Sequence, residues 1–155
     1  MHKVCQVSKP EAPLTFYEEA DAFKLFLLDC GLLGAMNMTD ATEAMLTDNI
    51  FEEYNGALTE QLVLQELKCV PNLPVYYYTK QNSQQEIDFV IEIKNRAIPV
   101  EAKAGENLQA KSLKQFIQEN KSEKAIKTSL KQYKGNEVID NVPLYALYCY
   151  LQEPQ

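Results

Sequence analysis

Asp88, Glu101 and Lys103 are the residues of this chain whose types and spacing best suit chemistry. Hard divalent cations such as Mg²⁺ and Mn²⁺ prefer oxygen ligands, usually one or two carboxylates, with water and substrate phosphate completing the shell. Such a cation activates an attacking water and stabilises the charge that develops when a phosphodiester is hydrolysed. Lys103 stands two residues after Glu101, on the same strand face, where it adds a positive charge beside that water. We therefore expect Asp88 and Glu101 to hold Mg²⁺ or Mn²⁺.

Two neighbouring strands are predicted to carry these side chains. In residues 86–93 (EIDFVIEI), period-two alternation places Asp88 on one face and the apolar side chains on the other. Residues 97–103 (AIPVEAK) repeat the pattern, with Glu101 and Lys103 opposite their apolar neighbours. The apolar face is predicted to comprise Ile87, Phe89, Ile91 and Ile93 from the first strand and Ile98, Val100 and Ala102 from the second.

Glu60 is the fourth candidate, and it belongs to a predicted helix over residues 51–68. Ala57, Glu60, Leu64 and Leu67 form one stripe of that helix at i, i+3, i+7 and i+10. Burying an unpaired carboxylate costs several kcal/mol. Glu60 should therefore bind the cation, directly or through water, or lie at the edge of the helix. Glu66, on the same helix, is the competing candidate.

Each element also has a purely structural interpretation. An aspartate within a strand is often an edge residue, and Glu101 paired with a neighbouring lysine is equally an ordinary salt bridge. The combination favours a site, because Glu101 follows Asp88 by 13 positions with one hairpin turn between them.

The elements around the candidates predict an α/β fold with a mixed sheet flanked by helices. Residues 23–29 are predicted to form a buried strand that turns at two glycines into a short helix, after an irregular N-terminal arm. Residues 37–50 are expected to hold another short helix. The remaining predicted elements are strands over 75–79, 86–93, 97–104 and 125–130, a helix over 107–119, and a helix or strand over 143–151. The first three of these strands are close enough for antiparallel hairpins, and the helix over 107–119 provides the crossover to the strand at 125–130.

Composition and charge limit the possible classes of function. At 155 residues with 46% hydrophobic content, the chain suits one globular domain, with residues 1–50 packed on a core of residues 51–155. No apolar run reaches the roughly 20 residues of a membrane helix, and no leader pattern is evident, so a cytoplasmic location is expected. The four cysteines are widely spaced and predicted to be buried thiols, and the single histidine, His2, stands at the chain start, where order is expected to be poor.

The net charge of −7 argues against a protein that coats nucleic acid, yet the charge is unevenly distributed. Residues 1–66 carry three basic and twelve acidic groups, whereas residues 106–136 carry seven lysines against three glutamates. If DNA binds, we expect it near the lysine-rich segment 111–134. The alternative interpretation of that segment is a solvated surface.

Several runs of this sequence resemble an uncharacterised domain that follows an AAA-type ATPase module in many bacterial and archaeal proteins. The runs are FKLFLLDCGLLGAM (23–36), GALTEQLVLQELK (56–68), EIDFVIE (86–92), IPVEAKAG (98–105) and VPLYAL (142–147). The resemblance implies a restriction-endonuclease-like fold of the PD-(D/E)xK superfamily. Glu60, Asp88, Glu101 and Lys103 match the helix Glu, strand Asp and ExK positions of that superfamily, although Ile87 replaces the proline of the motif.

Two hypotheses for function follow. The first is a Mg²⁺- or Mn²⁺-dependent deoxyribonuclease domain that uses Asp88, Glu101 and Glu60 as ligands and Lys103 as the stabilising charge. The second is an idle nuclease fold that binds protein or nucleic acid. The chain has no GxxxxGK[ST] motif, so ATPase activity is not attributed to it, and we expect it to be attached to an ATPase module in a longer protein. A homodimer is a further expectation, since nuclease folds of this kind often pair subunits.

Overall fold

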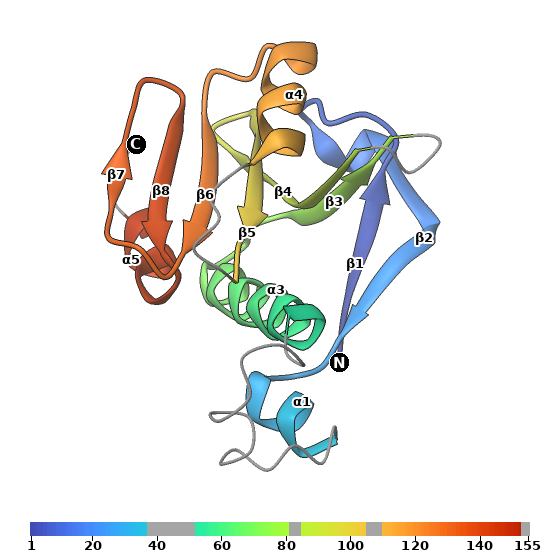
Figure 1. Cartoon of the computed structure of the whole chain (residues 1–155). Coiled ribbons are helices and arrows are strands. Elements are labelled where there is room, and N and C mark those ends of the chain that lie inside the picture. The colour runs from blue at the N-terminus through green and yellow to red at the C-terminus, as the bar shows by residue number, and fades with distance from the viewer. Residues whose placement is uncertain (37–51, 81–84, 105–109, 153–155) are drawn as a thin grey trace.

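The computed structural model describes residues 1–36, 52–80, 85–104 and 110–152 (Figure 1). These residues form an α/β fold with one eight-stranded mixed sheet, four α-helices and two short 3₁₀ helices. The strands are β1 (His2–Val7), β2 (Glu18–Phe26), β3 (Val75–Thr79), β4 (Glu86–Ile93), β5 (Arg96–Ala102), β6 (Ala125–Ser129), β7 (Lys134–Gly135) and β8 (Ile139–Pro143). The helices are α1 (Cys30–Met36), α3 (Glu52–Cys69), α4 (Lys111–Asn120) and α5 (Leu147–Gln152), and the 3₁₀ helices are η1 (Leu14–Tyr17) and η2 (Leu144–Ala146).

The strand order is β2-β1-β3-β4-β5-β6-β8-β7. The predicted antiparallel succession β3-β4-β5 is confirmed. β6 then joins β5 in parallel after the crossover through α4, also as predicted. β8 lies parallel to β6, and β1 joins the sheet by pairing in parallel with β3.

Helices cover both faces of the sheet, and each face has its own hydrophobic core. On one face, α3 contributes Val63, Leu64 and Leu67, and α5 contributes Leu147. The other face is covered by α4 and η1, with buried side chains at Leu14, Leu113 and Phe116. Burying an aliphatic side chain of this size contributes about 1.5–3 kcal/mol. The two layers therefore hold the central strands, and the candidate residues on them, in fixed positions.

The N-terminal strands differ from the prediction. β1 begins at His2, where an irregular arm and poor order were expected. β2 lies at the edge of the sheet and is mostly exposed, with Phe23 at 44% and Leu25 at 59% exposure, so the buried strand predicted over residues 23–29 is wrong. Apolar content indicated burial, but no described element packs over the outer side of this edge strand. Phe26 alone reaches the core, where its ring lies 5.7 Å from that of Phe89.

β4 does not alternate simply. Phe89 and Ile91 pack on the α3 side as predicted, but Ile87 packs on the α4 side together with Val90. A register irregularity between β3 and β4 lies next to Ile87, and an extra residue in a ladder reverses the side-chain alternation beyond it. On β5 the prediction holds, since Ile98, Val100 and Ala102 all belong to the α3-side core.

Several boundaries differ from those predicted. The helix over 51–68 corresponds to α3, whereas the helix expected from residue 107 begins at Lys111, with residues 105–109 outside the described ones. The helix predicted over 37–50 also lies outside the described residues. In the segment 143–151, which was predicted as a helix or strand, Pro143 ends β8 and residues 144–151 are helical; β7 and β8 were not predicted.

The cysteines are not the buried thiols that were predicted. Cys5 and Cys30 are half-buried, and Cys69 and Cys149 are exposed. Cys69 is the last residue of α3, and Cys149 lies within the short helix α5. Among the helices that the structure describes, none is long and apolar enough to cross a membrane.

Candidate active site

Asp88 and Glu101 lie across from each other on adjacent strands. Phe89 pairs with Val100 in the antiparallel β4–β5 ladder, so Asp88, one residue before, stands opposite Glu101, one residue after. The backbone N–H of Ala102 donates a hydrogen bond of 2.7 Å to Asp88 Oδ2. The hairpin predicted from the sequence thus brings the two carboxylates together.

Glu101 is buried, with 4% of its surface exposed. Its Oε1 forms an ion pair with Lys103 Nζ at a distance of 2.6 Å. Its Oε2 is buried and has no hydrogen-bond partner. A buried carboxylate oxygen without a partner is costly in a folded protein, so such an atom calls for an explanation such as a bound water or ion.

Electrostatics around Asp88 are unfavourable to its charged form. Burial, followed by the charges of Glu101 and Glu60, raises the pKa of Asp88 from 3.8 to about 7, against the opposing effects of the Ala102 N–H and Lys24. Like-charged carboxylates in one site repel, and a nearby cation relieves that repulsion. The charge distribution therefore favours a bound cation.

Lys103 is held in its charged form. Burial lowers the pKa of Lys103, but the hydrogen bond to Glu101 and the charges of Glu101, Asp88 and Glu60 outweigh it, so the pKa is raised. Its backbone N–H donates to the carbonyl of Thr128 on β6 at 3.0 Å, which fixes the strand end. The ammonium group is therefore a fixed positive charge beside Glu101.

Glu60 reaches the same site from α3. It is half-buried, and its Oε2 lies 3.5 Å from Lys24 Nζ on β2. The competing residue Glu66 accepts a hydrogen bond from the backbone N–H of Tyr148 at 3.1 Å and so holds α5. Of the two glutamates that helical phase allowed, Glu60 is the one whose charge acts on Asp88.

Lys24 and Glu86 also belong to this cluster, and sequence reasoning missed both. Lys24 Nζ lies 2.5 Å from Glu86 Oε1. Burial lowers the pKa of Lys24, but the Glu86 hydrogen bond and the charges of Glu60, Glu86 and Asp88 raise it overall. The available signals were a lysine inside the apolar run FKLFLL and a glutamate two residues before Asp88.

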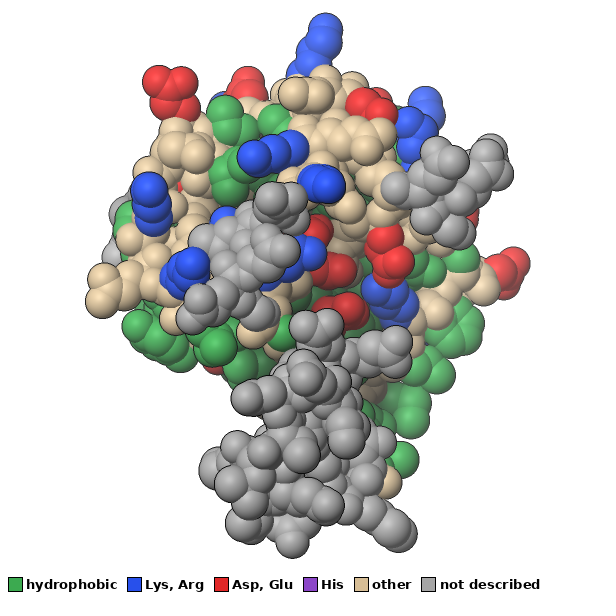
Figure 2. All heavy atoms as spheres, viewed as in Figure 1, with side chains coloured by type: hydrophobic (Ala, Val, Ile, Leu, Met, Phe, Trp, Pro, Cys, Tyr) green, Lys and Arg blue, Asp and Glu red, His purple; other side chains and the backbone are tan. Residues whose placement is uncertain are grey.

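The cluster contains four carboxylates, on Glu60, Glu86, Asp88 and Glu101, and two ammonium groups, on Lys24 and Lys103. When all are ionised, the formal charge is −2. Figure 2 shows Asp and Glu side chains gathered in the middle of one face, with Lys and Arg side chains beside them. An excess of negative charge remains for a cation to neutralise.

The donor set suits a hard cation held by few protein ligands. In the part of the chain that the structure describes, no three His, Cys, Asp or Glu side chains are arranged as a complete metal-binding group. Asp88 bonds the Ala102 N–H, Glu101 bonds Lys103, and Glu60 faces Lys24. A pair of carboxylates with one unpartnered oxygen matches the way Mg²⁺ is bound, by one or two carboxylates plus water and substrate oxygens.

Comparison with known proteins identifies a family. Residues 55–148 match the family described as "Domain of unknown function (DUF4143)", and because this match covers well over half of the chain, the chain belongs to that family. The family is uncharacterised and is often found with AAA-type ATPases. The matched residues contain all four predicted site residues, whereas the run 23–36 lies before them. No curated protein and no solved structure matches the chain.

Proposed function

We propose that this DUF4143 chain is a metal-dependent nuclease-type domain that hydrolyses DNA phosphodiesters, on a fold of the restriction-endonuclease-like, PD-(D/E)xK type. The observation that carries the proposal is the buried Glu101 carboxylate, whose Oε2 has no partner, across from Asp88, whose pKa is raised to about 7. Perturbed, desolvated carboxylates of this kind cluster at functional sites. An ion pair with Lys103 accounts for Oε1 of Glu101 but leaves the buried Oε2 unexplained.

The residues of the chain have distinct roles in this proposal. Asp88 and Glu101 would hold Mg²⁺ or Mn²⁺, and Glu60 would act at longer range through water. When bound, the cation would supply charge stabilisation and a more acidic water. Lys103 would place its ammonium group beside the attacking water and the phosphate, and Lys24 would keep Glu60 and Glu86 in place. The two strands position the groups before substrate arrives, which is the main source of catalysis in phosphoryl transfer.

Cleavage of DNA tests this proposal directly. Supercoiled and single-stranded DNA would be incubated with the chain and Mg²⁺ or Mn²⁺, and nicking compared with the Asp88→Asn and Lys103→Gln variants. The matched controls are Asp21→Asn and Lys68→Gln, because both residues are exposed and each control changes the net charge by the same amount as its partner.

We expect cleavage by the wild-type chain and by both controls, and its loss in both site variants. Equal residual cleavage in all five proteins would indicate a contaminating nuclease and would refute the site as described.

An idle binding module is the alternative, and specific observations favour it. Lys24 and Lys103 already pair with three of the four carboxylates, which reduces the need for a cation. Exposed apolar side chains on β2 and α1 suit a protein partner such as an ATPase module or a second copy of the chain; they are Phe23, Leu25, Leu32 and Met36. Crystals soaked in Mn²⁺ discriminate the two. Anomalous density between Asp88 and Glu101 supports the nuclease, and its absence at millimolar metal supports the binding module.

A further inference from the structure

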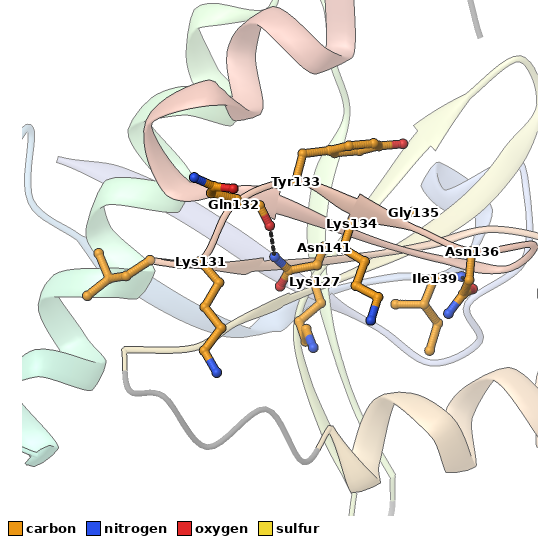
Figure 3. A pocket seen from close by; sticks show the side chains of 10 residues that line it. Lys127, Lys131, Gln132, Tyr133, Lys134, Gly135, Asn136, Ile139 and Asn141 are labelled. Carbon is orange, nitrogen blue, oxygen red and sulfur yellow. Dashed lines mark hydrogen bonds between the residues drawn. The ribbon is translucent and has the colours of Figure 1, made fainter.

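A pocket of about 740 Å³ lies between the end of β6 and the β7–β8 hairpin (Figure 3). We call it the lysine pocket, because it is lined by Lys127 on β6, Lys131 in the following loop and Lys134 on β7. Figure 3 shows the side chains of these three lysines extending to the same side of the ribbon, away from that of Tyr133. Asn136 and Asn141 add amide groups to the lining.

The cations of the lysine pocket lack counter-charges among the described residues. In the described part of the chain no carboxylate forms an ion pair with the three lysines of the pocket. Several other described lysines also lack an ion pair, but these three differ in lining one pocket together. Burial, then the positive charges of Lys114, Lys131 and Lys103, lowers the pKa of Lys127. Like charges held together without a partner destabilise the free protein, and an anion relieves them.

The loop between β6 and β7, which carries Lys131, is held by hydrogen bonds to Asn141 on β8 and to Ser129 at the end of β6. Asn141 is 7% exposed; its Nδ2 donates to the carbonyl of Gln132 at 3.1 Å, and its Oδ1 accepts from Ser129 Oγ at 2.9 Å. Ser129 Oγ in turn accepts from the backbone N–H of Lys131 at 3.2 Å. This network preorganises the loop, so an anion would bind without the cost of ordering it.

The lysine pocket adjoins the candidate active site. Lys127 is the register partner of Glu101 in the parallel β5–β6 ladder, so the two lie about 4.8 Å apart across neighbouring strands. The Lys103 backbone bonds Thr128, the residue after Lys127. An extended anion that places one phosphate at Glu101 would therefore reach the pocket with its next phosphates.

We propose that the lysine pocket binds the backbone phosphates that flank the scissile phosphodiester of a nucleic-acid strand, an inference that rests on the proposed nuclease function. A strand fits better than a small phosphate compound, since the three cations are distributed along β6, its loop and β7 instead of converging on one point. Because the net charge of the chain is −7, the protein as a whole repels DNA, so we expect binding to depend on the lysine pocket.

Measuring DNA affinity in the absence of metal tests this proposal independently of DNA cleavage. Affinity for a fluorescein-labelled DNA of about 15 nucleotides, a length in the range of single-strand binding sites, would be measured by anisotropy in EDTA over a series of salt concentrations. A duplex of the same length forms the second arm, and unlabelled tripolyphosphate serves as a competitor. The variant is Lys131→Gln combined with Lys134→Gln, both exposed and outside the packed core. The control is Lys68→Gln combined with Lys9→Gln, which removes the same charge from two exposed sites elsewhere.

For the wild type we expect a salt slope of about −3 with the duplex and about −2 with the single strand, since each neutralised phosphate contributes about 0.9 in a duplex and about 0.7 in a single strand. The pocket variant should lose about ten-fold or more in affinity and about two units of slope, while the control changes neither beyond the scatter of the assay. The arm that binds more tightly identifies single-stranded or duplex substrate. Equal affinity of the two double variants, or displacement of DNA by tripolyphosphate at equimolar phosphate, would overturn the proposal. A wild type that binds through the pocket but never cleaves would refute the nuclease alone.

Discussion

Two buried carboxylates in this protein, Glu101 and Asp140, have nearly the same exposure and opposite surroundings. Glu101 is 4% and Asp140 is 3% exposed, and each pairs with a lysine, Lys103 at 2.6 Å and Lys124 at 2.9 Å. Asp140 also accepts a hydrogen bond of 2.5 Å from the hydroxyl of Tyr150. Both of these contacts fall on Oδ2 of Asp140. Glu101 differs in that its Oε2 is buried without a partner and in that it lies opposite a second carboxylate, Asp88.

The partners of these two carboxylates distinguish a structural residue from a functional one better than their degree of burial does. Asp140 ties β8 to α5 and to Lys124, because it bonds the hydroxyl of Tyr150 and the ammonium group of Lys124. Glu101 repels a second carboxylate and leaves one of its oxygens unbonded, which costs stability unless a ligand is present. We interpret Asp140 as a structural residue and Glu101 as a residue held for binding.

The largest expected effect comes from exchanging the two carboxylates for amides in separate proteins. Glu101→Gln should reduce cleavage by about 10³-fold, or about 4 kcal/mol in the barrier, with little loss of stability because it also removes repulsion with Asp88. Asp140→Asn should cost about 2 kcal/mol in the free energy of unfolding and leave cleavage nearly unchanged. Nicking rates and urea denaturation measure the two quantities. If both variants affect the same quantity, the contrast between the sites is wrong.

The pH dependence of stability should differ between wild type and Asp88→Asn in EDTA. Because the pKa of Asp88 is raised from 3.8 to about 7, the folded state holds a proton at pH 5 that the unfolded chain has released. The folded state then binds more protons, so the free energy of unfolding contributed by Asp88 falls as the pH rises from about 4 to about 7. We expect wild type to lose on the order of 2–3 kcal/mol relative to Asp88→Asn between pH 4.5 and 8. Stability would be measured from urea denaturation midpoints at each pH. If the stability of the two proteins changes with pH in the same way, the proposed repulsion between Asp88 and its neighbouring carboxylates is refuted.

Added Mg²⁺ should stabilise the wild type through the same repulsion. At pH 8, where Asp88 is ionised, metal at about 100 times its Kd would add about 2.7 kcal/mol, read as a rise in Tm. The rise should be smaller at pH 5, where Asp88 holds a proton, and absent in Glu101→Gln. Asp140→Asn, whose carboxylate lies at the other cluster, should respond to metal as wild type does; a loss of the response there would show that the two clusters are coupled.

The smallest effect is expected for Tyr150→Phe, which removes a hydroxyl next to Asp140. Loss of one hydrogen bond to a charged group should lower the free energy of unfolding by about 1.5 kcal/mol, without a change in metal response or cleavage. Thermal denaturation provides the measurement. A stability equal to wild type would mean that Lys124 alone satisfies Asp140.

Much of the central fold could be predicted from local pattern. The β-rich runs at 75–79, 86–93 and 97–103 and the uninterrupted helix after residue 51 correspond to described elements, because their alternation or propensity agrees with their tertiary environment. Predictions failed where position in the sheet outweighed composition. β2 is apolar but lies at the edge, and Ile87 changes face beside a register irregularity. The edge position of β2 and the face on which Ile87 packs cannot be read from a short stretch of sequence, because both depend on neighbouring strands.

Local pattern alone predicts that Asp88 and the Glu101-Ala102-Lys103 run stand on adjacent strands, since short turns and period-two alternation allow few other arrangements. Which glutamate of α3 approaches them, that Lys24 and Glu86 join the cluster, and that Lys127 lies beside Glu101 all depend on how the elements pack together. The physical reason is that charge and hydrogen-bond satisfaction depend on every group within a few ångströms. Those groups come from β2, α3 and β6, which are separated along the chain and meet only when the sheet is assembled.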